Sequence, residues 1–144
     1  MKMVDIGGKE ITEREATVEG LVSLNPKIIL TIKKRKVPKG DVLEAARFAG
    51  ILAAKKTPFL IPLCHPIPIE YAEIIFSLRK SEIKITSIVR AKAKTGVDME
   101  ALTATAVAAL TIYDMCKPLD KNIVISGIKL IKKTGGKSGT YIRK

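Results

Sequence analysis

The fold is decided by a stretch in the middle of the chain, Ile69-Glu-Tyr-Ala-Glu-Ile-Ile-Phe-Ser-Leu78, and by Ile83-Lys-Ile-Thr-Ser-Ile88 shortly after it. Apolar and polar residues alternate in both segments, which is typical of strands with one buried face. The polar break Arg79-Lys-Ser81 between them marks a turn. The stretch therefore predicts a β-hairpin, and a hairpin is by construction an antiparallel pair.

Outward from this hairpin, further elements follow from alternation, helical spacing and capping residues. Proline in the first turn suits the short helix that opens at 25–26, and Asp41 suits the N-cap of the alanine-rich one. The predicted elements are a strand over 15–23 with Ala16, Val18 and Val22 on one side, a short helix from 25–26, a helix from Asp41 to about Lys56 closed before Thr57-Pro58, a helix over about 98–116, and a strand over 123–132.

The helix over 98–116 has the clearest boundaries. Thr95-Gly96 marks a turn before it, Thr95 and Asp98 have the spacing of a capping box, and Pro118 ends it. Apolar residues that recur along one face are expected to pack inward. They are Leu102, Ala106, Ala109, Leu110 and Tyr113.

The order of elements is β-α-β-β-α-β, with an extra helical piece before the first long helix. This order predicts an α+β, ferredoxin-like fold in which helices pack on one face of an antiparallel sheet. The length of 144 residues fits one domain spanning 1–144, and no linker or low-complexity segment is visible. The second face of the sheet needs a cover, so we expect an oligomer.

Charge sets the class of partner. The chain has 26 Lys+Arg against 14 Asp+Glu, a formal net charge of +12. Such a balance favours an anionic partner, namely a nucleotide, a polyphosphate or a nucleic acid. Aromatic residues make up 4% of the chain and tryptophan is absent, so base-stacking platforms are few and nucleic acid is the less expected partner.

The sequence also predicts a cytoplasmic location. No apolar run approaches the roughly 20 residues of a membrane span. The N-terminus becomes charged by Lys9-Glu10, unlike a signal peptide. Two cysteines, Cys64 and Cys116, fit reduced thiols better than a disulfide framework, although a bond between them stays open at this level.

His65 is the only histidine of the chain and lies between Cys64 and Pro66. Histidine is the side chain that most readily exchanges protons near neutral pH, but a lone one is more often structural. Prolines 62, 66 and 68 hold the segment extended, so the side chains of Cys64 and His65 point to opposite faces and chelate poorly. We expect no metal site.

Asp114 and Lys117 are spaced i,i+3 on the last predicted helix, as a surface ion pair or as an acid–base pair. Glu100 lies fourteen positions before Asp114, on the same side of the helix but about 21 Å away along its axis. A small substrate cannot touch both in one chain. Either one of them is structural, or two subunits build the site.

The first helical turn leaves alternatives open. Asp98 is the expected cap of the helix. Glu100 either interacts favourably with the helix dipole or accepts paired hydrogen bonds from a guanine-like edge.

Lys132-Lys-Thr-Gly-Gly-Lys-Ser-Gly139 resembles a phosphate loop only superficially. The glycine that a P-loop requires is replaced by Ile131, and only five residues remain for the following helix. The segment is either an anion-binding nest or a flexible tail.

Five segments together carry a specific resemblance. They are Lys39-Gly-Asp41, Leu63-Cys-His-Pro66, Thr95-Gly-Val-Asp-Met-Glu-Ala-Leu-Thr103, Ala108-Ala-Leu-Thr-Ile-Tyr-Asp-Met-Cys-Lys117 and Lys133-Thr-Gly-Gly-Lys-Ser-Gly139. In this order, and over about residues 3–139, the chain resembles the MoaC family of molybdenum-cofactor biosynthesis. Asp98, where the family commonly has Glu, and Thr134, often Ser, are departures.

The resemblance implies a lyase without a cofactor that converts the cyclised dihydroguanosine triphosphate made by an upstream radical cyclase. The products would be cyclic pyranopterin monophosphate and pyrophosphate. It also implies a homohexamer built as a trimer of dimers, with sites at subunit interfaces. The implied catalytic residues are Asp114, Lys117 and Lys133. The implied substrate-binding residues are Leu63, Cys64, His65, Met99, Glu100, Lys39, Arg14 and Lys137.

Two other functions fit the residues without the resemblance. A small basic nucleotide- or RNA-binding module without catalysis would explain the net charge. A metal-dependent nucleotide hydrolase would explain the acidic residues, but less well.

Overall fold

Five strands form one antiparallel sheet in the order β2-β3-β1-β4-β5. The computed structural model describes residues 1–144. The elements in chain order are β1 (Thr12–Ser23), α1 (Pro26–Lys33), α2 (Val42–Lys55), α3 (Thr57–Leu60), β2 (Tyr71–Leu78), β3 (Glu82–Ala93), α4 (Asp98–Cys116), β4 (Val124–Thr134) and β5 (Tyr141–Ile142). The predicted α+β class with an antiparallel sheet is confirmed.

The predicted hairpin is β2–β3. Its register runs from Leu78 opposite Ile83 to Tyr71 opposite Arg90. The turn is closed by a hydrogen bond of 2.9 Å from the Arg79 amide to the Glu82 carbonyl. The second arm is longer than the sequence indicated, because β3 continues past Ile88 to pair with the full length of β1.

β1 is the central strand and pairs with β3 on one side and β4 on the other. Ala16, Val18 and Val22 are fully buried, which confirms the predicted apolar side. The strand begins at Thr12, three residues earlier than predicted. The added residues include Arg14, which is also buried.

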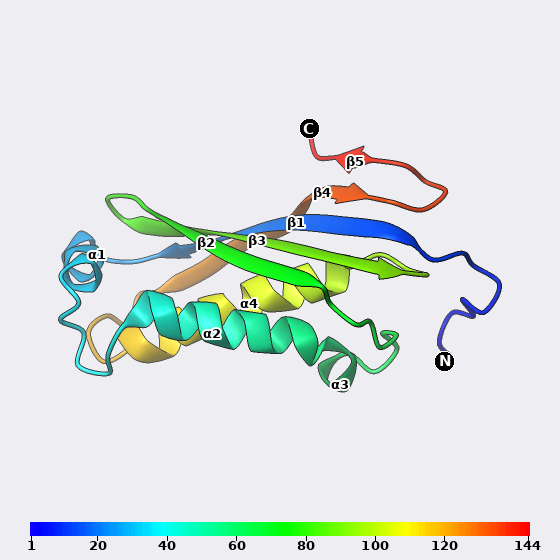
Figure 1. Cartoon of the computed structure of the whole chain (residues 1–144). Coiled ribbons are helices and arrows are strands. Elements are labelled where there is room, and N and C mark those ends of the chain that lie inside the picture. The colour runs from blue at the N-terminus through cyan, green and yellow to red at the C-terminus, as the bar shows by residue number, and fades with distance from the viewer.

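α2 and α4 lie together on one face of the sheet (Figure 1). Their contact is close because the facing residues are small: a Cβ added at Gly50 would lie 2.9 Å from the Ala104 carbonyl oxygen. Ala46 and Ala108 are fully buried beside it. A larger residue at position 50 would therefore force the two helices apart.

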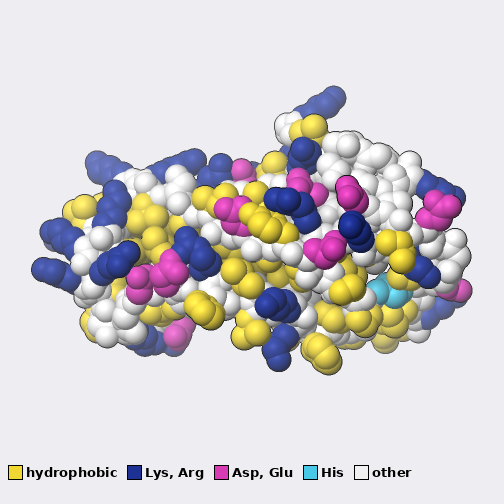
Figure 2. Space-filling model, in the orientation of Figure 1, with side chains coloured by type: hydrophobic (Ala, Val, Ile, Leu, Met, Phe, Trp, Pro, Cys, Tyr) yellow, Lys and Arg dark blue, Asp and Glu magenta, His cyan; other side chains and the backbone are white.

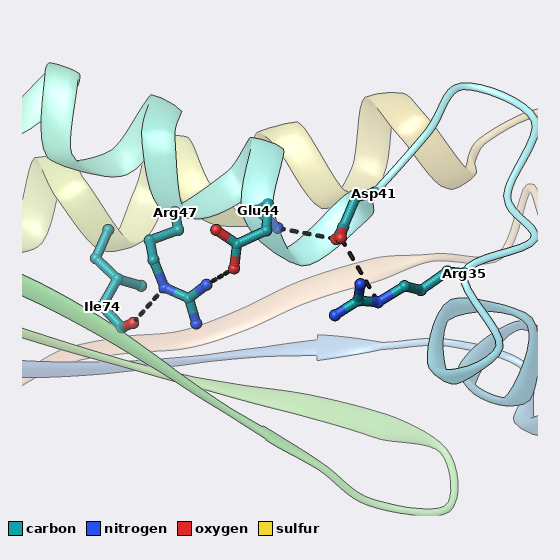
Figure 3. A network of polar contacts seen from close by, with 5 residues as sticks. All are labelled: Arg35, Asp41, Glu44, Arg47 and Ile74. Atoms are coloured by element: carbon teal, nitrogen blue, oxygen red, sulfur yellow. Dashed lines mark hydrogen bonds and ion pairs between the residues drawn. The ribbon is translucent and has the colours of Figure 1, made fainter.

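The start of α2 is fixed by polar contacts (Figure 3). As predicted, Asp41 is the N-cap and accepts a hydrogen bond of 3.2 Å from the Glu44 amide. Arg47, one turn further along, pairs with Glu44 and donates to the Ile74 carbonyl at 3.2 Å. These contacts tie α2 to the edge strand β2.

The other face of the sheet has no helical cover and carries charged side chains. Arg90 lies 2.9 Å from Glu15, and Lys84 lies 2.9 Å from Glu19. The Arg90 guanidinium also lies 4.1 Å from the centre of the Tyr71 ring. These pairs satisfy one another within the chain.

Exposed apolar side chains lie on the helices as well as on the sheet, where Ile75 of β2 is 44% exposed. Phe48 and Leu52 on α2 are 79% and 53% exposed, and Phe59 of α3 is 86% exposed. Figure 2 shows apolar side chains on the helical side of the molecule and basic ones spread around them.

The predicted inward face of α4 is wrong in part. Ala109 is buried, but Leu110 is 57% and Tyr113 37% exposed. The side that packs against the sheet and α2 includes Ala101, Ala104, Ala108, Ile112 and Cys116. Apolar residues of α4 lie on every side of the helix, so helical spacing alone cannot predict which side is buried.

The predicted capping box is also wrong. The N-cap of α4 is Val97, which offers no side-chain hydrogen bond, and Asp98 is the first helical residue. Helix α3 was not predicted; the turn at Thr57-Pro58 continues as this single short helix.

The glycine-rich C-terminal segment is a hairpin and not a flexible tail. β4 ends at Thr134 and the chain returns as β5, which places Tyr141 opposite Lys133. The loop between them is closed by a hydrogen bond from the Gly139 amide to the Gly136 carbonyl. None of the helices has the length and apolar character needed to cross a membrane.

Candidate functional site

The candidate residues gather at the two ends of α4. Asp114 lies in its last turn and Glu100 in its first. At a rise of about 1.5 Å per residue, the two carboxylates are separated by about 21 Å along the axis. The environments at the two ends differ sharply.

At the C-terminal end, two lysines hold the Asp114 carboxylate. Lys117 Nζ lies 3.1 Å from Oδ1, and Lys39 Nζ lies 3.2 Å from Oδ2. Lys39 also donates to the Asp114 backbone carbonyl at 2.9 Å. The hydrogen bonds from Lys117 and then Lys39 lower the pKa of Asp114 below its ordinary value, so the group is a carboxylate at neutral pH.

The local chain explains this geometry. A carboxylate in the last turn of a helix is opposed by the helix dipole, whereas a lysine there is favoured. Lys117, the C-cap residue, offsets that cost from one side. Lys39 arrives on the loop before α2, where Gly40 adopts a φ of 121° that other residues rarely adopt.

At the N-terminal end, Glu100 is 2% exposed and its Oε2 atom has no hydrogen-bond partner. Burial, with a smaller contribution from Asp98, raises the pKa of Glu100 to about 7. Near neutral pH the group therefore exists in both protonation states. An unpartnered buried carboxyl group calls for a ligand or a partner.

Cys64 lies beside this group, on the segment between α3 and β2. Burial raises the pKa of the Cys64 thiol, and the nearby Glu100 and Asp98 charges raise it further. The residue therefore remains a thiol and is unsuited to act as a nucleophile. Leu63 is 44% exposed next to it.

His65 contacts a different neighbour from Cys64, although the segment is not extended throughout as predicted: a turn at 61–64 is closed by a hydrogen bond of 3.1 Å from the Cys64 amide to the Ile61 carbonyl. Its Nε2 atom lies 2.7 Å from the backbone carbonyl oxygen of Val4, in the N-terminal segment. This contact leaves His65 apart from Asp114 within the chain, since Asp114 lies at the far end of α4.

Lys133 reaches the N-terminal end of α4 from β4. It lies opposite Ala16, a buried residue of β1, and so points to the helical side of the sheet. Its Nζ atom lies 3.4 Å from Asp98 Oδ1.

Arg14 is a buried cation on the same side of the sheet. Its Nε atom donates to the Ala93 carbonyl at 3.3 Å, and its side chain packs against Gly135 and Gly136. A Cβ at Gly136 would collide with the guanidinium, so the glycine pair is needed for this close approach. The glycines therefore pack the hairpin onto Arg14.

Two further predicted residues, Met99 and Lys137, are described by their location and burial. Met99 is half-buried in the first turn of α4, next to Glu100. Lys137 is exposed in the loop 135–140. No group of three His, Cys, Asp or Glu side chains is arranged to hold a metal ion.

The structure thus brings the predicted residues together in two groups. The N-terminal group comprises Cys64, Met99, Glu100, Lys133 and Arg14; the C-terminal group comprises Asp114, Lys117 and Lys39. Sequence reasoning missed the Asp98–Lys133 and Lys39–Asp114 pairs. Both join residues far apart in the chain, and no spacing rule signals such pairs.

Comparisons with known proteins find relatives that match nearly the whole chain. The model of the MoaC family matches residues 3–136. Cyclic pyranopterin monophosphate synthase of Peptoclostridium acidaminophilum is 53% identical over 142 residues, covering 99% of this chain and 90% of the relative. The proteins of the same name from Pelotomaculum thermopropionicum and Streptomyces coelicolor are 52% and 47% identical, each over 99% of this chain, with 85% and 84% of the relative covered.

Proposed function

Because the chain belongs to the MoaC family, we propose that it is a lyase of molybdenum-cofactor biosynthesis. Its substrate is the cyclised dihydroguanosine triphosphate that an upstream radical cyclase supplies. It releases pyrophosphate and forms cyclic pyranopterin monophosphate. A binding module without catalysis is not favoured, since the relatives are named as synthases.

The observation that carries this proposal is the Asp114 carboxylate between two ammonium groups. Ring opening and reclosure require protons to be taken up and delivered at defined positions. Asp114, held as a carboxylate, accepts a proton, while Lys117 is the donor placed beside it. Both side chains are more than half exposed, so a substrate can reach them.

The N-terminal group is proposed to hold the substrate. The Glu100 carboxyl group and the backbone of 63–65 recognise the purine edge, with Met99 beside them. Lys133, Arg14 and Lys137, with Lys39 from the other group, supply positive charge for the triphosphate and for the departing pyrophosphate. His65 borders this region, and it takes part in proton transfer once the Val4 contact opens.

We propose that two copies of the chain complete one site. Within one chain, α4 separates Asp114 from Glu100 by about 21 Å, too far for one small molecule. Exposed Phe48, Leu52 and Leu110 on the helical side offer apolar surface for a contact between copies. The proposed assembly is a homohexamer built as a trimer of dimers, which light scattering would detect as six times 15.7 kDa.

Three further features belong to the same proposal. The strand order β4-β1-β3-β2, with the two long helices α2 and α4 on one face of the sheet, supports a ferredoxin-like fold that is extended by β5. The chain acts as one domain over 1–144, without a cofactor or a metal. Both cysteines are free thiols, which supports a cytoplasmic location.

Turnover of the cyclised dihydroguanosine triphosphate tests the proposed function. We expect one pyrophosphate for each pterin, followed together by phosphate analysis and by fluorescence of the oxidised pterin. Chelator should leave the rate unchanged once substrate-bound Mg²⁺ is accounted for. Neither product from folded oligomeric protein, together with salt-dependent binding of arbitrary oligonucleotides, would support a binding module instead.

A further inference from the structure

Lys133 is held at a defined place beside the start of α4. It comes from β4, and its Nζ atom lies 3.4 Å from Asp98 Oδ1, with both side chains about two thirds buried. Partial burial strengthens such a pair relative to one in open water. The contact therefore fixes where the ammonium group points.

Gly96 provides the space for this side chain. A Cβ at this position would lie 2.8 Å from Lys133 Cε and 2.9 Å from Asp98 Oδ1. Both distances are shorter than real Cβ contacts. Lys133 thus passes directly over the Gly96 backbone, and any side chain at 96 would displace it.

Helix capping does not explain the position of Asp98. It is not the N-cap of α4, and that helix has no side-chain cap. A first-turn carboxylate gains from the helix dipole, which accounts for an acidic residue here but not for its contact with Lys133. Asp98 also places a second negative charge beside the buried Glu100, which is unfavourable for that neighbour.

We infer that Asp98 is the positioning residue for Lys133 and that Gly96 is the gap that admits the lysine. The inference rests on the proposed function in one respect, that Lys133 acts on the substrate. Asp98 and Gly96 then act only through Lys133. Neither needs to touch the substrate.

The pair itself is tested without any turnover. Competitive acetylation of the folded oligomer, read for each lysine by mass spectrometry, reports how accessible and how free each amine is. We expect Lys133 to react several-fold faster in Asp98→Asn than in the wild type, and at the wild-type rate in Asp98→Glu. Glu44→Gln is the matched control, since it removes a first-turn carboxylate from α2. Unchanged Lys133 reactivity in Asp98→Asn would overturn the inference whatever the protein's activity.

The link to catalysis is tested by a double-mutant cycle. Asp98→Asn is expected to lower kcat up to about 100-fold, because a displaced catalytic group loses its alignment. Asp98→Glu should recover most of the lost kcat. The melting temperature of Asp98→Asn should differ from that of the wild type no more than that of Glu44→Gln does. Adding Asp98→Asn or Gly96→Ala to Lys133→Ala should cause no further loss.

The outcomes separate this inference from the proposed function. Independent, multiplying losses from Asp98→Asn and Lys133→Ala would show that Asp98 acts on its own and would overturn the positioning role. A wild-type protein that releases no pyrophosphate would refute the proposed function, while the acetylation result would still decide whether Asp98 holds Lys133.

Discussion

The two ends of α4 show how one helix gives two carboxylates opposite properties. Asp114 lies in the open, where Lys117 and Lys39 lower its pKa. Glu100 is buried without a partner for one of its oxygens, and burial raises its pKa to about 7. The neighbouring lysines determine the direction of the pKa shift at Asp114, whereas desolvation determines it at Glu100.

This difference separates two kinds of work. An ionised carboxylate beside an ammonium group suits proton transfer to and from a bound molecule. A buried carboxyl group with an unused oxygen suits recognition of a ligand that supplies the missing hydrogen bond. Pairs of titratable groups whose environments push their pKa values apart are typical of acid–base enzymes.

The largest expected effect is the loss of activity in Asp114→Asn. The substitution keeps the shape of the side chain but removes the charge that accepts a proton. We expect turnover to fall about 100- to 10,000-fold. The fold should remain, because exposed ion pairs contribute little to stability. Steady-state kinetics and a thermal melt measure the two effects.

Glu82→Gln is the control for Asp114→Asn, because it breaks another exposed i,i+3 pair, with Arg79. It should leave both turnover and the melt nearly unchanged. Turnover of Asp114→Asn within a fewfold of the wild type would reduce Asp114 to a salt-bridge residue, and the contrast between the ends of α4 would carry no mechanism.

A mixing experiment tests whether the two ends meet across subunits. Asp114→Asn and Lys133→Ala carry their defects at opposite ends of α4, and each should be nearly inactive. If every site takes one end from each copy, a mixed dimer contains one intact site. Random reassembly of equal amounts should therefore restore about a quarter of the wild-type activity, as two-fold symmetry requires.

The control for the mixing experiment is a chain that carries both substitutions, mixed with the wild type. In that pairing a mixed dimer keeps one intact site only if the two ends lie in the same chain, so the mixture should retain about half of the wild-type activity in that case and about a quarter if two copies share each site. About half of the activity there, with no activity restored in the first mixture, would show that each chain holds a complete site and would contradict the proposed assembly.

The strands and helices were largely predictable because their signals are local. Alternation located β2 and β3, and Asp41 located the start of α2. The failures arose where local rules gave no unique answer. Apolar residues lie on every side of α4, so helical spacing predicts Leu110 on the buried side although it is exposed. The short strand β5 forms by pairing with β4, and no sequence pattern within β5 predicts this pairing.

The candidate site was predictable in its residues more than in its contacts. The Asp114–Lys117 pair followed from helical spacing. Lys39 and Lys133 could be named only through the resemblance, since their partners lie 75 and 35 positions away in the chain. The sequence predicts Asp98 as a cap, because its pairing with Lys133 depends on how β4 packs beside α4 and has no local signal. Burial of Glu100 was likewise invisible, although it decides the properties of that carboxyl group.

The pH dependence of stability tests the contrast between the two ends of α4 at its buried end, where Glu100 lies. Glu100 has a raised pKa, from 4.5 to about 7, so the folded state keeps a proton that the unfolded state has lost. Between these values the folded protein binds more protons, and its free energy of unfolding must fall as the pH rises. The full shift corresponds to a loss of about 3 kcal/mol above pH 7, as an order of magnitude.

Glu100→Gln should remove that loss, because the amide stays neutral at every pH. Urea unfolding at pH 5, 6, 7 and 8, at one fixed protein concentration, measures it. We expect the variant to be more stable than the wild type at pH 8 and close to it at pH 5. Glu44→Gln, which removes an exposed carboxylate, should follow the wild-type curve throughout. Parallel curves for Glu100→Gln and the wild type would mean that Glu100 is already ionised and partnered in the assembled protein. The second copy would then supply the hydrogen bond that one chain lacks, and the two ends of α4 would differ in their partners and not in their access to water.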